Sequence, residues 1–330
     1  MPASLPPAVL LGNPQRIPDV YPPALLDRLR QCVALAGEIP SSQPIPAETE
    51  ILLGTWGMPL LDEAFLQRLP NLRGVFYGAG TIRGFVTEAF WDRQIPVVSA
   101  AAANAVPVVD YTVSVVLLGL KRFFYMARTM RERRRKPADI HRVVPGNYGA
   151  LIGLVSFGKI ARMVAARLIQ AGCRVQVYDP FLSAEAASES GVELCTLERL
   201  FSTSDIVSVH APNLPETRGL LGSEHFNLMR NETTFINTAR GAVVREPELV
   251  RFLAERPDVQ AVLDVTLPEP PETDSPLYEL PNVILTPHIA GSLGRECGRM
   301  GELAVEEVER FLRGEPLQHV VTREQAATLA

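Results

Sequence analysis

The amino-acid sequence predicts an α/β protein that contains two doubly wound parallel sheets. Short apolar runs alternate with amphipathic stretches in residues 8–100 and again in residues 149–290, which is the pattern of successive strand and helix units. The chain has 330 residues, enough for two domains of ordinary size. A long apolar stretch with helical spacing lies between the two series, and we expect it to connect the domains.

The composition is typical of a soluble globular protein, since 47% of the residues are hydrophobic and 21% are charged. A net charge of −5 provides no field that attracts nucleic acid or an anionic membrane. Four widely spaced cysteines lack metal-ligand spacing and are expected to be reduced thiols. The N-terminus has no basic signal-peptide region, and no apolar run is expected to reach a membrane-spanning length. We therefore expect a cytoplasmic protein without a metal, a nucleic-acid partner or a membrane partner.

The first series is expected to form a small parallel sheet with helices on both faces. Its strand candidates are residues 8–11, 51–55, 72–77 and 96–99. Its helix candidates are residues 22–33, 62–69 and 87–93. Residues 40–46, PSSQPIP, are expected to be a proline-rich loop inside this domain.

Residues 106–136 are expected to form one long helix that crosses between the domains. Their valine and threonine content would suit a strand, but apolar residues repeat on one helical face over a length that no strand reaches. The stretch ends in the charged run RERRRK at residues 131–136. This run suits a helix C-terminus or a partner subunit, and contact with nucleic acid is the less favoured alternative.

The second series opens with the order expected of a dinucleotide-binding unit. A buried strand (residues 150–155) leads through a tight turn to a helix that continues to Gly172, and a second strand (174–178) ends at Asp179. In such a unit the helix N-terminus receives the pyrophosphate and the acid bonds the ribose hydroxyls. The turn has Ser156, Gly158 and Ala161 where the G-x-G-x-x-G fingerprint has three glycines, so the motif alone is a weak signal.

The same turn yields expectations about the cofactor. A carboxylate at Asp179 disfavours a 2′-phosphate, so NAD is expected over NADP. The Ser156 hydroxyl is expected to bond a phosphate or to cap the helix.

The rest of the second series extends this sheet to six predicted strands. The further strand candidates are residues 206–210, 234–237, 259–265 and 283–286. The helix candidates are residues 197–202, 224–229 and 246–255. A last helix, residues 292–312, is expected to return to the first domain, and the tail after Gly314 is expected to be partly frayed.

Four segments resemble the D-2-hydroxyacid dehydrogenase family, which contains D-lactate, D-glycerate and D-3-phosphoglycerate dehydrogenases. They are HAPNLPETRGLLG (210–222), FINTARGAVV (235–244), AVLDVTLPEPP (261–271) and ILTPHIAGS (284–292). The resemblance implies an NAD-binding Rossmann domain (104–291) inserted into a flavodoxin-like substrate domain (1–103 and 292–330). It also implies a homodimer formed through the cofactor domain.

The resemblance places three catalytic residues. Oxidation of a 2-hydroxy acid needs a cation for the carboxylate, and Arg240 matches the family's arginine in the TARG turn. It also needs a proton carrier, for which His288 matches the family's histidine. Glu269, in the LPEP turn, matches the glutamate that would stabilise the imidazolium. Each residue alone is more often a surface or loop residue, but all three follow strand candidates, which favours the joint functional interpretation.

The cofactor contacts implied by the turn and by the resemblance form a larger set. They are Ser156, Phe157, Gly158, Lys159, Ile160, Asp179, His210, Pro212, Thr217, Thr238, Ala239, Asp264, His288 and Gly291. In this set Asp264 is expected to reach the nicotinamide amide. Two alternatives remain open: Asp264 could instead cap the following turn, and Pro212 could merely end a strand.

Substrate contacts are expected at Ala79 and Gly80 in the segment YGAGTIR, together with Arg240. This loop departs from the family pattern at Ile82 and Arg83. Arg83 could be a second contact for an acidic or phosphorylated substrate, and a surface salt bridge is an equal alternative.

The sequence thus predicts an NAD-dependent enzyme that interconverts a D-2-hydroxy acid and its 2-keto acid. The alternative is an NAD-responsive regulatory protein on the same fold, similar to the family's corepressor relatives, with little or no turnover. A structural α/β protein that binds no nucleotide is a third hypothesis, and it predicts no thermal shift with NAD.

Overall fold

A computed structural model describes residues 4–39, 44–136, 140 and 144–328. Residues 40–43 of the predicted proline-rich loop lie outside the described residues, as do both chain ends. The chain forms two compact units. The first contains the segments up to Val106 and from Ser292 onward, and the second contains Pro107–Gly291.

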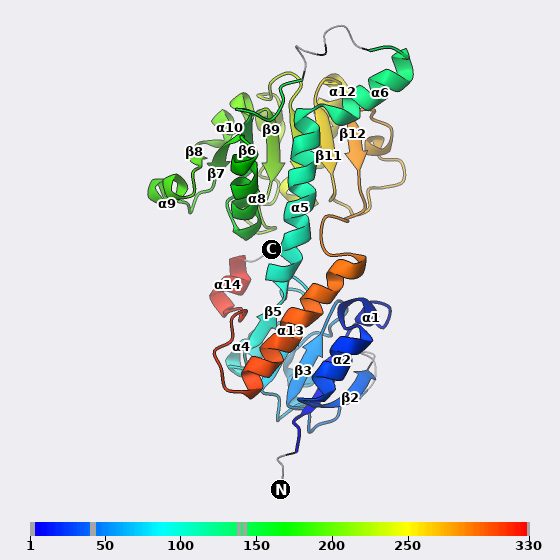
Figure 1. The fold of residues 1–330 in the computed structure, drawn as a ribbon, viewed down its shortest axis with the longest axis vertical. Coiled ribbons are helices and arrows are strands. Elements are labelled where there is room, and N and C mark those ends of the chain that lie inside the picture. The colour runs from blue at the N-terminus through cyan, green and yellow to red at the C-terminus, as the bar shows by residue number, and fades with distance from the viewer. Residues whose placement is uncertain (1–3, 40–43, 137–139, 141–143, 329–330) are drawn as a thin grey trace. The chain divides into compact units, whose positions relative to one another are not determined.

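The first unit contains a five-stranded parallel sheet with the order β2-β1-β3-β4-β5 (Figure 1). Its strands are β1 (Pro7–Leu11), β2 (Ala34–Ile39), β3 (Ile51–Gly54), β4 (Gly74–Tyr77) and β5 (Val97–Ser99). This is the flavodoxin-like order, and it confirms the predicted fold class. Successive residues of β1 enter different cores, Leu10 on one face of the sheet and Leu11 on the other. Burial on both faces explains why the strands read as continuous apolar runs.

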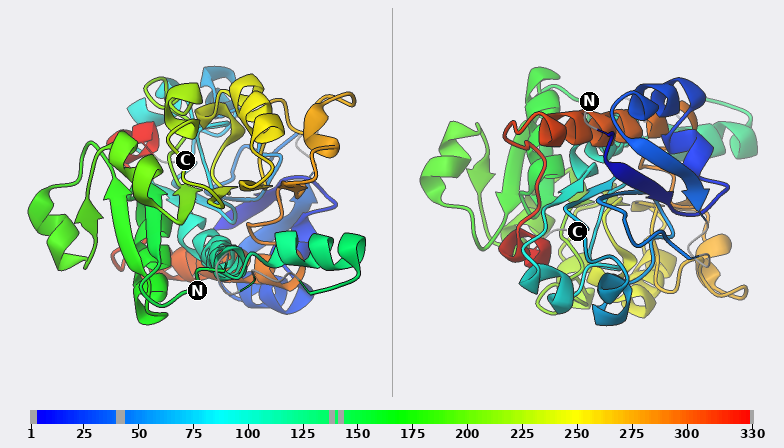
Figure 2. Two further views of the ribbon diagram at one scale, coloured as in Figure 1. Left: turned by 90° about the horizontal axis from the view of Figure 1, so that it is seen from above. Right: turned by 90° about the horizontal axis from the view of Figure 1, so that it is seen from below.

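The helices of the first unit cover both faces of this sheet. They are α1 (Ile17–Val20), α2 (Pro23–Arg30), α3 (Glu63–Gln67), α4 (Glu88–Asp92), α13 (Cys297–Leu312) and α14 (Arg323–Thr328). Helix α13 packs against α1, α2 and β4 (Figures 1 and 2). Its Glu309 accepts two hydrogen bonds from Arg28 of α2, at 2.7 and 2.8 Å. The predicted return helix is therefore confirmed, although a short 3-10 turn (Gly294–Glu296) precedes its first α-helical residue.

Residues 315–328 of the tail after Gly314 adopt defined structure, so the expectation of fraying is wrong for this part of the chain. Val320 pairs with Val98 in an antiparallel bridge, and Val321 is buried. The buried carboxylate of Glu307 accepts hydrogen bonds from the amides of Gln318 and His319, at 2.8 and 3.1 Å. These contacts join residues distant in sequence, which composition alone does not reveal.

The predicted single helix over residues 106–136 is two helices, α5 (Ala101–Leu120) and α6 (Phe123–Arg133). Arg122 between them adopts a left-handed conformation with φ of 50°. Its guanidinium is buried, lies 2.8 Å from Glu232 and donates to the carbonyl of Asp258 at 3.0 Å. These bonds hold the chain out of the helical path at that point.

Helix α5 is long and apolar enough, by length and composition alone, to cross a membrane. The expectation that no apolar run reaches a spanning length is therefore wrong for this helix. Several of its side chains, including Val109, Val116 and Leu120, are buried in the core of the second unit.

The second unit contains a seven-stranded parallel sheet with the order β12-β11-β10-β9-β6-β7-β8. Its strands are β6 (Leu151–Val155), β7 (Arg174–Tyr178), β8 (Glu193–Leu194), β9 (Ile206–Val209), β10 (Thr234–Asn237), β11 (Gln260–Leu263) and β12 (Val283–Leu285). The order reverses between β6 and β9, as in a Rossmann fold. Six of these strands were predicted, and β8 is the seventh.

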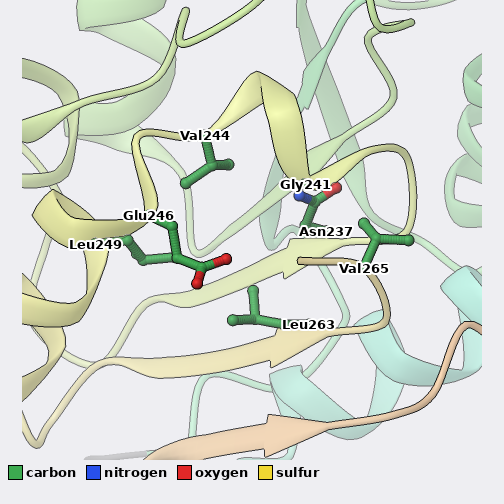
Figure 3. A pocket seen from close by; sticks show the side chains of 7 residues that line it. All are labelled: Asn237, Gly241, Val244, Glu246, Leu249, Leu263 and Val265. Atoms are coloured by element: carbon green, nitrogen blue, oxygen red, sulfur yellow. The ribbon is translucent and has the colours of Figure 1, made fainter. Parts of the chain in front are cut away.

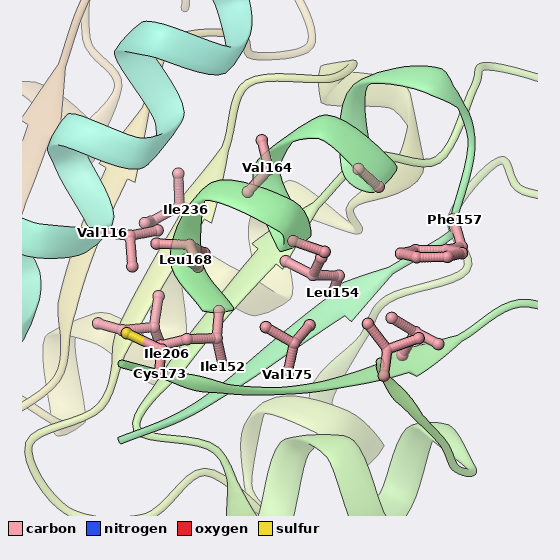
Figure 4. Packing of buried hydrophobic residues seen from close by; sticks show 14 of the residues in the cluster. Val116, Ile152, Leu154, Phe157, Val164, Leu168, Cys173, Val175, Ile206 and Ile236 are labelled. Carbon is pink, nitrogen blue, oxygen red and sulfur yellow. The ribbon is translucent and has the colours of Figure 1, made fainter. Parts of the chain in front are cut away.

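The helices of the second unit after α6 are α8 (Lys159–Gln170), α9 (Ala184–Glu189), α10 (Leu197–Thr203), α11 (Ser223–Phe226) and α12 (Glu246–Glu255). Figure 4 shows Leu168 of α8 near Ile152 of β6, and both belong to one buried cluster with Val164 of α8 and Val175 of β7. This packing fixes the first β-α-β unit and thereby the position of its turn.

Candidate active site

The predicted catalytic and cofactor residues follow the carboxyl ends of parallel strands in the second unit. Asp179 follows β7, His210 follows β9, and the TARG turn follows β10. Asp264 follows β11, and His288 lies three residues after β12. Because these strands are parallel, their carboxyl ends share one edge of the sheet, which is where open α/β sheets bind ligands.

At this edge His288 and Glu269 form a hydrogen-bonded pair. The distance from His288 Nδ1 to Glu269 Oε1 is 2.6 Å, and the two side chains are 48% and 40% exposed. An ionised carboxylate can only accept, so Nδ1 carries the proton of this bond. The other ring nitrogen, Nε2, is then the one left for a substrate oxygen.

Asp264 shapes the loop that carries His288. Its buried carboxylate accepts hydrogen bonds from Thr286 Oγ1 at 2.6 Å and from the amides of Ile289 and Ala290, both at 2.9 Å. Its backbone carbonyl accepts from the amide of His288 at 3.0 Å. These bonds hold His288 at a φ of 55°, a left-handed conformation that is uncommon outside glycine. These bonds run from Asp264 to the His288 loop, 22 to 26 residues further along the chain, and the nicotinamide contact of Asp264 stays a prediction.

The Arg240 turn is shaped by Asn237, a residue that the sequence analysis did not single out. The buried amide of Asn237 accepts from the Ala239 amide at 3.0 Å and donates to the Arg240 carbonyl at 3.1 Å. The Arg240 guanidinium donates to the Ala239 carbonyl at 2.6 Å. Burial lowers the pKa of Arg240, and the charge of Glu269 partly restores it. A polar residue at the end of an otherwise buried strand was the available signal for Asn237.

Two predicted cofactor residues form polar pairs within the second unit. The Thr238 hydroxyl lies 3.1 Å from that of Thr112 on α5, and both threonines are buried. His210 Nε2 lies 3.1 Å from Ser208 Oγ. Burial lowers the pKa of His210 to about 4, so this imidazole is neutral near pH 7.

The loop after His210 is closed by its own hydrogen bonds. The Thr217 hydroxyl donates to the carbonyl of Pro212 and accepts from the Leu214 amide, the latter at 2.9 Å. Pro212 and Thr217, both predicted beside the cofactor, therefore lie together. Gly291, the last residue of the second unit, directly follows the His288 loop.

The turn after β6 holds Asp179 in place. One carboxylate oxygen, Oδ2, accepts from the Phe157 amide at 2.7 Å and from the Ser156 hydroxyl at 3.2 Å. The other, Oδ1, accepts from the Phe181 amide at 2.8 Å. The expectation that Ser156 caps the helix is wrong, because the N-cap of α8 is Gly158 and no side chain caps it.

The N-terminus of α8 fits a pyrophosphate. A Cβ at Gly158 would meet no atom within 4 Å, and the helix continues through Lys159 and Ile160 without a side-chain cap on its first amides. Uncapped amides at a helix N-terminus form an anion site. Phe157, in contrast, turns its ring into the core, so only its backbone faces the turn.

Ser156 adopts a φ of 74°, in the region that glycine occupies without strain. We expect Ser156→Gly to be more stable than Ser156→Ala by about 1 kcal/mol, because both lack the hydroxyl and only alanine keeps a Cβ at positive φ. Urea unfolding measures the difference. The exposed mid-helix residue Ala166 is the matched control, since Ala166→Gly should destabilise the protein. An alanine variant at 156 as stable as the glycine variant would contradict the strain.

The predicted substrate residues Ala79, Gly80 and Arg83 belong to the first unit and follow β4. The Ser99 hydroxyl lies within hydrogen-bond distance of the carbonyls of Gly80 and Ala79, at 2.5 and 3.3 Å. Ala79 is buried, whereas Arg83 is exposed. Ser99 therefore fixes the backbone of this loop.

Comparison with known proteins identifies the family. Residues 113–290 match the model of the D-isomer specific 2-hydroxyacid dehydrogenase NAD binding domain. The chain belongs to this family. The matched residues lie within the second unit and include the Glu269–His288 pair. Because the matched model is that of an NAD-binding domain, NAD(H) is the cofactor of this dehydrogenase domain.

Three relatives illustrate the similarity. A D-3-phosphoglycerate dehydrogenase of Archaeoglobus fulgidus is 30% identical over 79% of this chain, and the chain spans only 49% of that relative. A glyoxylate reductase of Korarchaeum cryptofilum is 31% identical over 93% of this chain and 88% of its own length. A solved dehydrogenase of Xanthobacter autotrophicus Py2, in complex with NADPH and MES, is 25% identical with a TM-score of 0.77 and covers 98% of this chain and 100% of its own.

Proposed function

We propose that this dehydrogenase is an NAD-dependent enzyme that interconverts a D-2-hydroxy acid and its 2-keto acid by hydride transfer at C2. The hydrogen bond of 2.6 Å between Glu269 and His288, at the same sheet edge as Arg240, carries the proposal. A protein that only binds NAD needs no acid–base pair. Membership of the dehydrogenase family supports the same conclusion.

In the direction of reduction, Arg240 binds the carboxylate of the keto acid through its planar guanidinium. When bound, NADH supplies the hydride that C2 receives. His288 then donates the proton on Nε2 to the C2 oxygen, and Glu269 stabilises the imidazolium beforehand through Nδ1. In oxidation the same nitrogen accepts the proton.

The cofactor is held by the uncapped amides of Gly158, Lys159 and Ile160 and by Asp179. The Asp179 carboxylate repels a 2′-phosphate, so NADH should bind more tightly than NADPH. Titration of both cofactors by fluorescence tests this preference. Equal affinity, or tighter binding of NADPH, would contradict it.

We assign substrate binding to residues 1–103 and 292–330 and cofactor binding to residues 104–291. In the substrate domain, backbone amides near Ala79 and Gly80 contribute to binding the carboxylate, and Arg83 binds a second acidic group if the substrate carries one. Arg83→Ala should then raise KM for 3-phosphohydroxypyruvate more than for glyoxylate. An equal effect on both substrates would place Arg83 outside the substrate site.

A panel of 2-keto acids, followed by the absorbance of NADH, tests the activity itself. We expect oxidation of NADH with at least one member of a panel that includes glyoxylate, pyruvate, hydroxypyruvate and 3-phosphohydroxypyruvate. Tight NADH binding without turnover of any member would favour the regulatory alternative.

We further propose a homodimer located in the cytoplasm. Leu118 of α5 and Phe123 and Met130 of α6 are 37%, 50% and 48% exposed, so apolar side chains line the surface of these helices. The described cysteines are free thiols, which suits a reducing compartment. Light scattering during gel filtration should give twice the mass of one chain, and Phe123→Asp should lower it.

A further inference from the structure

Glu246 connects two parts of the site that the mechanism uses separately. It is the first residue of α12 and follows Arg240 by six positions, through a short 3-10 turn (Gly241–Val243). Its carboxylate oxygen Oε2 accepts a hydrogen bond of 2.9 Å from the amide of Leu267. Leu267 lies two residues before Glu269, so this bond reaches from the Arg240 segment to the Glu269 segment.

The two segments are also in direct backbone contact. A Cβ built on Gly241 would fall on the backbone carbonyl of Thr266, so no larger residue fits between them. The Thr266 hydroxyl in turn donates to the Pro268 carbonyl at 2.7 Å. Gly241 and Pro268 are therefore linked through Thr266. The charged carboxylate of Glu246 adds a hydrogen bond to Leu267, the residue between Thr266 and Pro268.

The half-buried Glu246 lines a small, mostly apolar cavity and also a larger, more open pocket that contains Arg218, Arg245 and Arg251. Figure 3 shows Glu246 at the small cavity of about 10 Å³, whose other lining residues are Asn237, Gly241, Val244, Leu249, Leu263 and Val265. Burial raises the pKa of Glu246, and the Leu267 hydrogen bond partly offsets that rise. Placing a carboxylate beside this cavity costs free energy that an apolar side chain would not, which points to a role for its hydrogen bond.

We infer that Glu246 is a positioning residue that holds the Leu267–Pro270 segment so that Glu269 stays within hydrogen-bond distance of His288. The inference rests on the proposed dehydrogenase activity, which it extends by one residue. Glu246 acts through Glu269, and it does not touch substrate or cofactor in this role. A displacement of the Glu269 carboxylate by about 1 Å would be enough to weaken the pair substantially.

Two substitutions separate the hydrogen bond from the size and charge of the side chain. Glu246→Leu keeps the approximate size and removes the acceptor, so kcat should fall roughly 10-fold or more. Glu246→Gln keeps an acceptor oxygen for Leu267 and should stay within about 3-fold of the wild type. Should the leucine variant fail to fold, Glu246→Asp replaces it, because the shorter side chain withdraws the carboxylate from Leu267.

Glu248 provides the matched control. It lies in the same first turn of α12, and its carboxylate likewise accepts from a backbone amide, that of Ser223, at 2.6 Å. Its bonds do not lead to the Glu269 segment in the part of the chain that the structure describes. Glu248→Leu should therefore leave kcat within about 2-fold, and an equal loss for both leucine variants would reduce Glu246 to a structural role.

A double-mutant cycle tests whether Glu246 acts through Glu269. In a Glu269→Ala background, Glu246→Leu should change kcat by less than about 2-fold, because the pair it supports is already lost. The same roughly 10-fold loss in both backgrounds would overturn the inference.

A readout independent of turnover separates this inference from the proposed activity. In full-length protein with ¹⁵N-labelled histidine, the Nδ1 signal of His288, assigned with His288→Gln, should shift in Glu246→Leu and not in Glu248→Leu. An unchanged signal in Glu246→Leu would overturn the positioning role even in an active enzyme. If no keto acid is turned over, the shift alone supports the role of Glu246, and the proposed activity fails by itself.

Discussion

Replacing His288 by glutamine should lower kcat/KM for the reduction of a 2-keto acid by roughly 10² to 10⁴-fold, the range for loss of a general acid. Glutamine keeps a similar length and some hydrogen-bonding capacity, but it has no proton that titrates near neutral pH. The dissociation constant for NADH should change little, because α8 and Asp179 supply most of the binding. Steady-state kinetics and a fluorescence titration of NADH measure the two quantities.

His319 offers a control for the histidine substitution. It lies in the first unit, where its backbone amide donates to the buried Glu307. His319→Gln should leave kcat/KM within about 2-fold of the wild type. A His288→Gln enzyme that kept more than about a fifth of its activity would exclude His288 as the proton donor.

The second large effect is expected at Arg240. Removing one partner of a buried charge pair costs about 2–5 kcal/mol, which corresponds to roughly 30- to 4000-fold in kcat/KM for Arg240→Ala. Arg240→Lys keeps the charge and loses the planar fork, so its loss should be intermediate. Most of the change should appear in KM, because the substrate carboxylate is bound in both the ground state and the transition state.

Arg251 of α12 is a suitable control for Arg240. Its side chain donates to the carbonyl of Pro247 on the same helix and has no assigned role in the site. Arg251→Lys should be neutral for kcat/KM within about 2-fold. If Arg240→Ala left KM unchanged while lowering the melting temperature, the arginine would be structural rather than a substrate ligand.

The fold was predictable because its strands are apolar runs of ordinary length, and the structure confirms two parallel sheets of α/β type. The elements that were missed are short or depend on distant contacts. Strand β8 has two residues and no apolar run, and β2 contains a glycine. The break between α5 and α6 arises because Arg122 bonds to Glu232 and Asp258, more than a hundred residues away.

Much of the candidate site could be read from the sequence, because each residue follows a strand and strands of a parallel sheet share one edge. The pairing of Glu269 with His288 was implied by the family resemblance, and the structure brings these side chains together. The supporting hydrogen bonds of Asn237, Asp264 and Glu246 were not foreseen. Their acceptor and donor partners are mostly backbone groups, which every residue carries, so side-chain patterns do not identify them.

At the Ser156 turn the sequence predicted an unusual backbone but not the hydrogen-bond partner of the serine hydroxyl. A missing glycine marked the turn as unusual, and we expected the hydroxyl to bond a phosphate or cap the helix. The structure instead directs the hydroxyl to Asp179 at 3.2 Å, because the left-handed backbone of Ser156 turns its side chain toward the end of β7. The substitution therefore contributes to holding the acid that is proposed to bind the ribose.

Transfer of deuterium from NADH that carries deuterium at both C4 positions tests the central claim most directly. A 2-keto acid from the panel is reduced with this cofactor, and the product is analysed by mass spectrometry and chiral chromatography. The account predicts a 2-hydroxy acid of the D configuration that carries one deuterium at C2. A product without deuterium at C2, or one of the L configuration, would contradict the proposed D-specific hydride transfer.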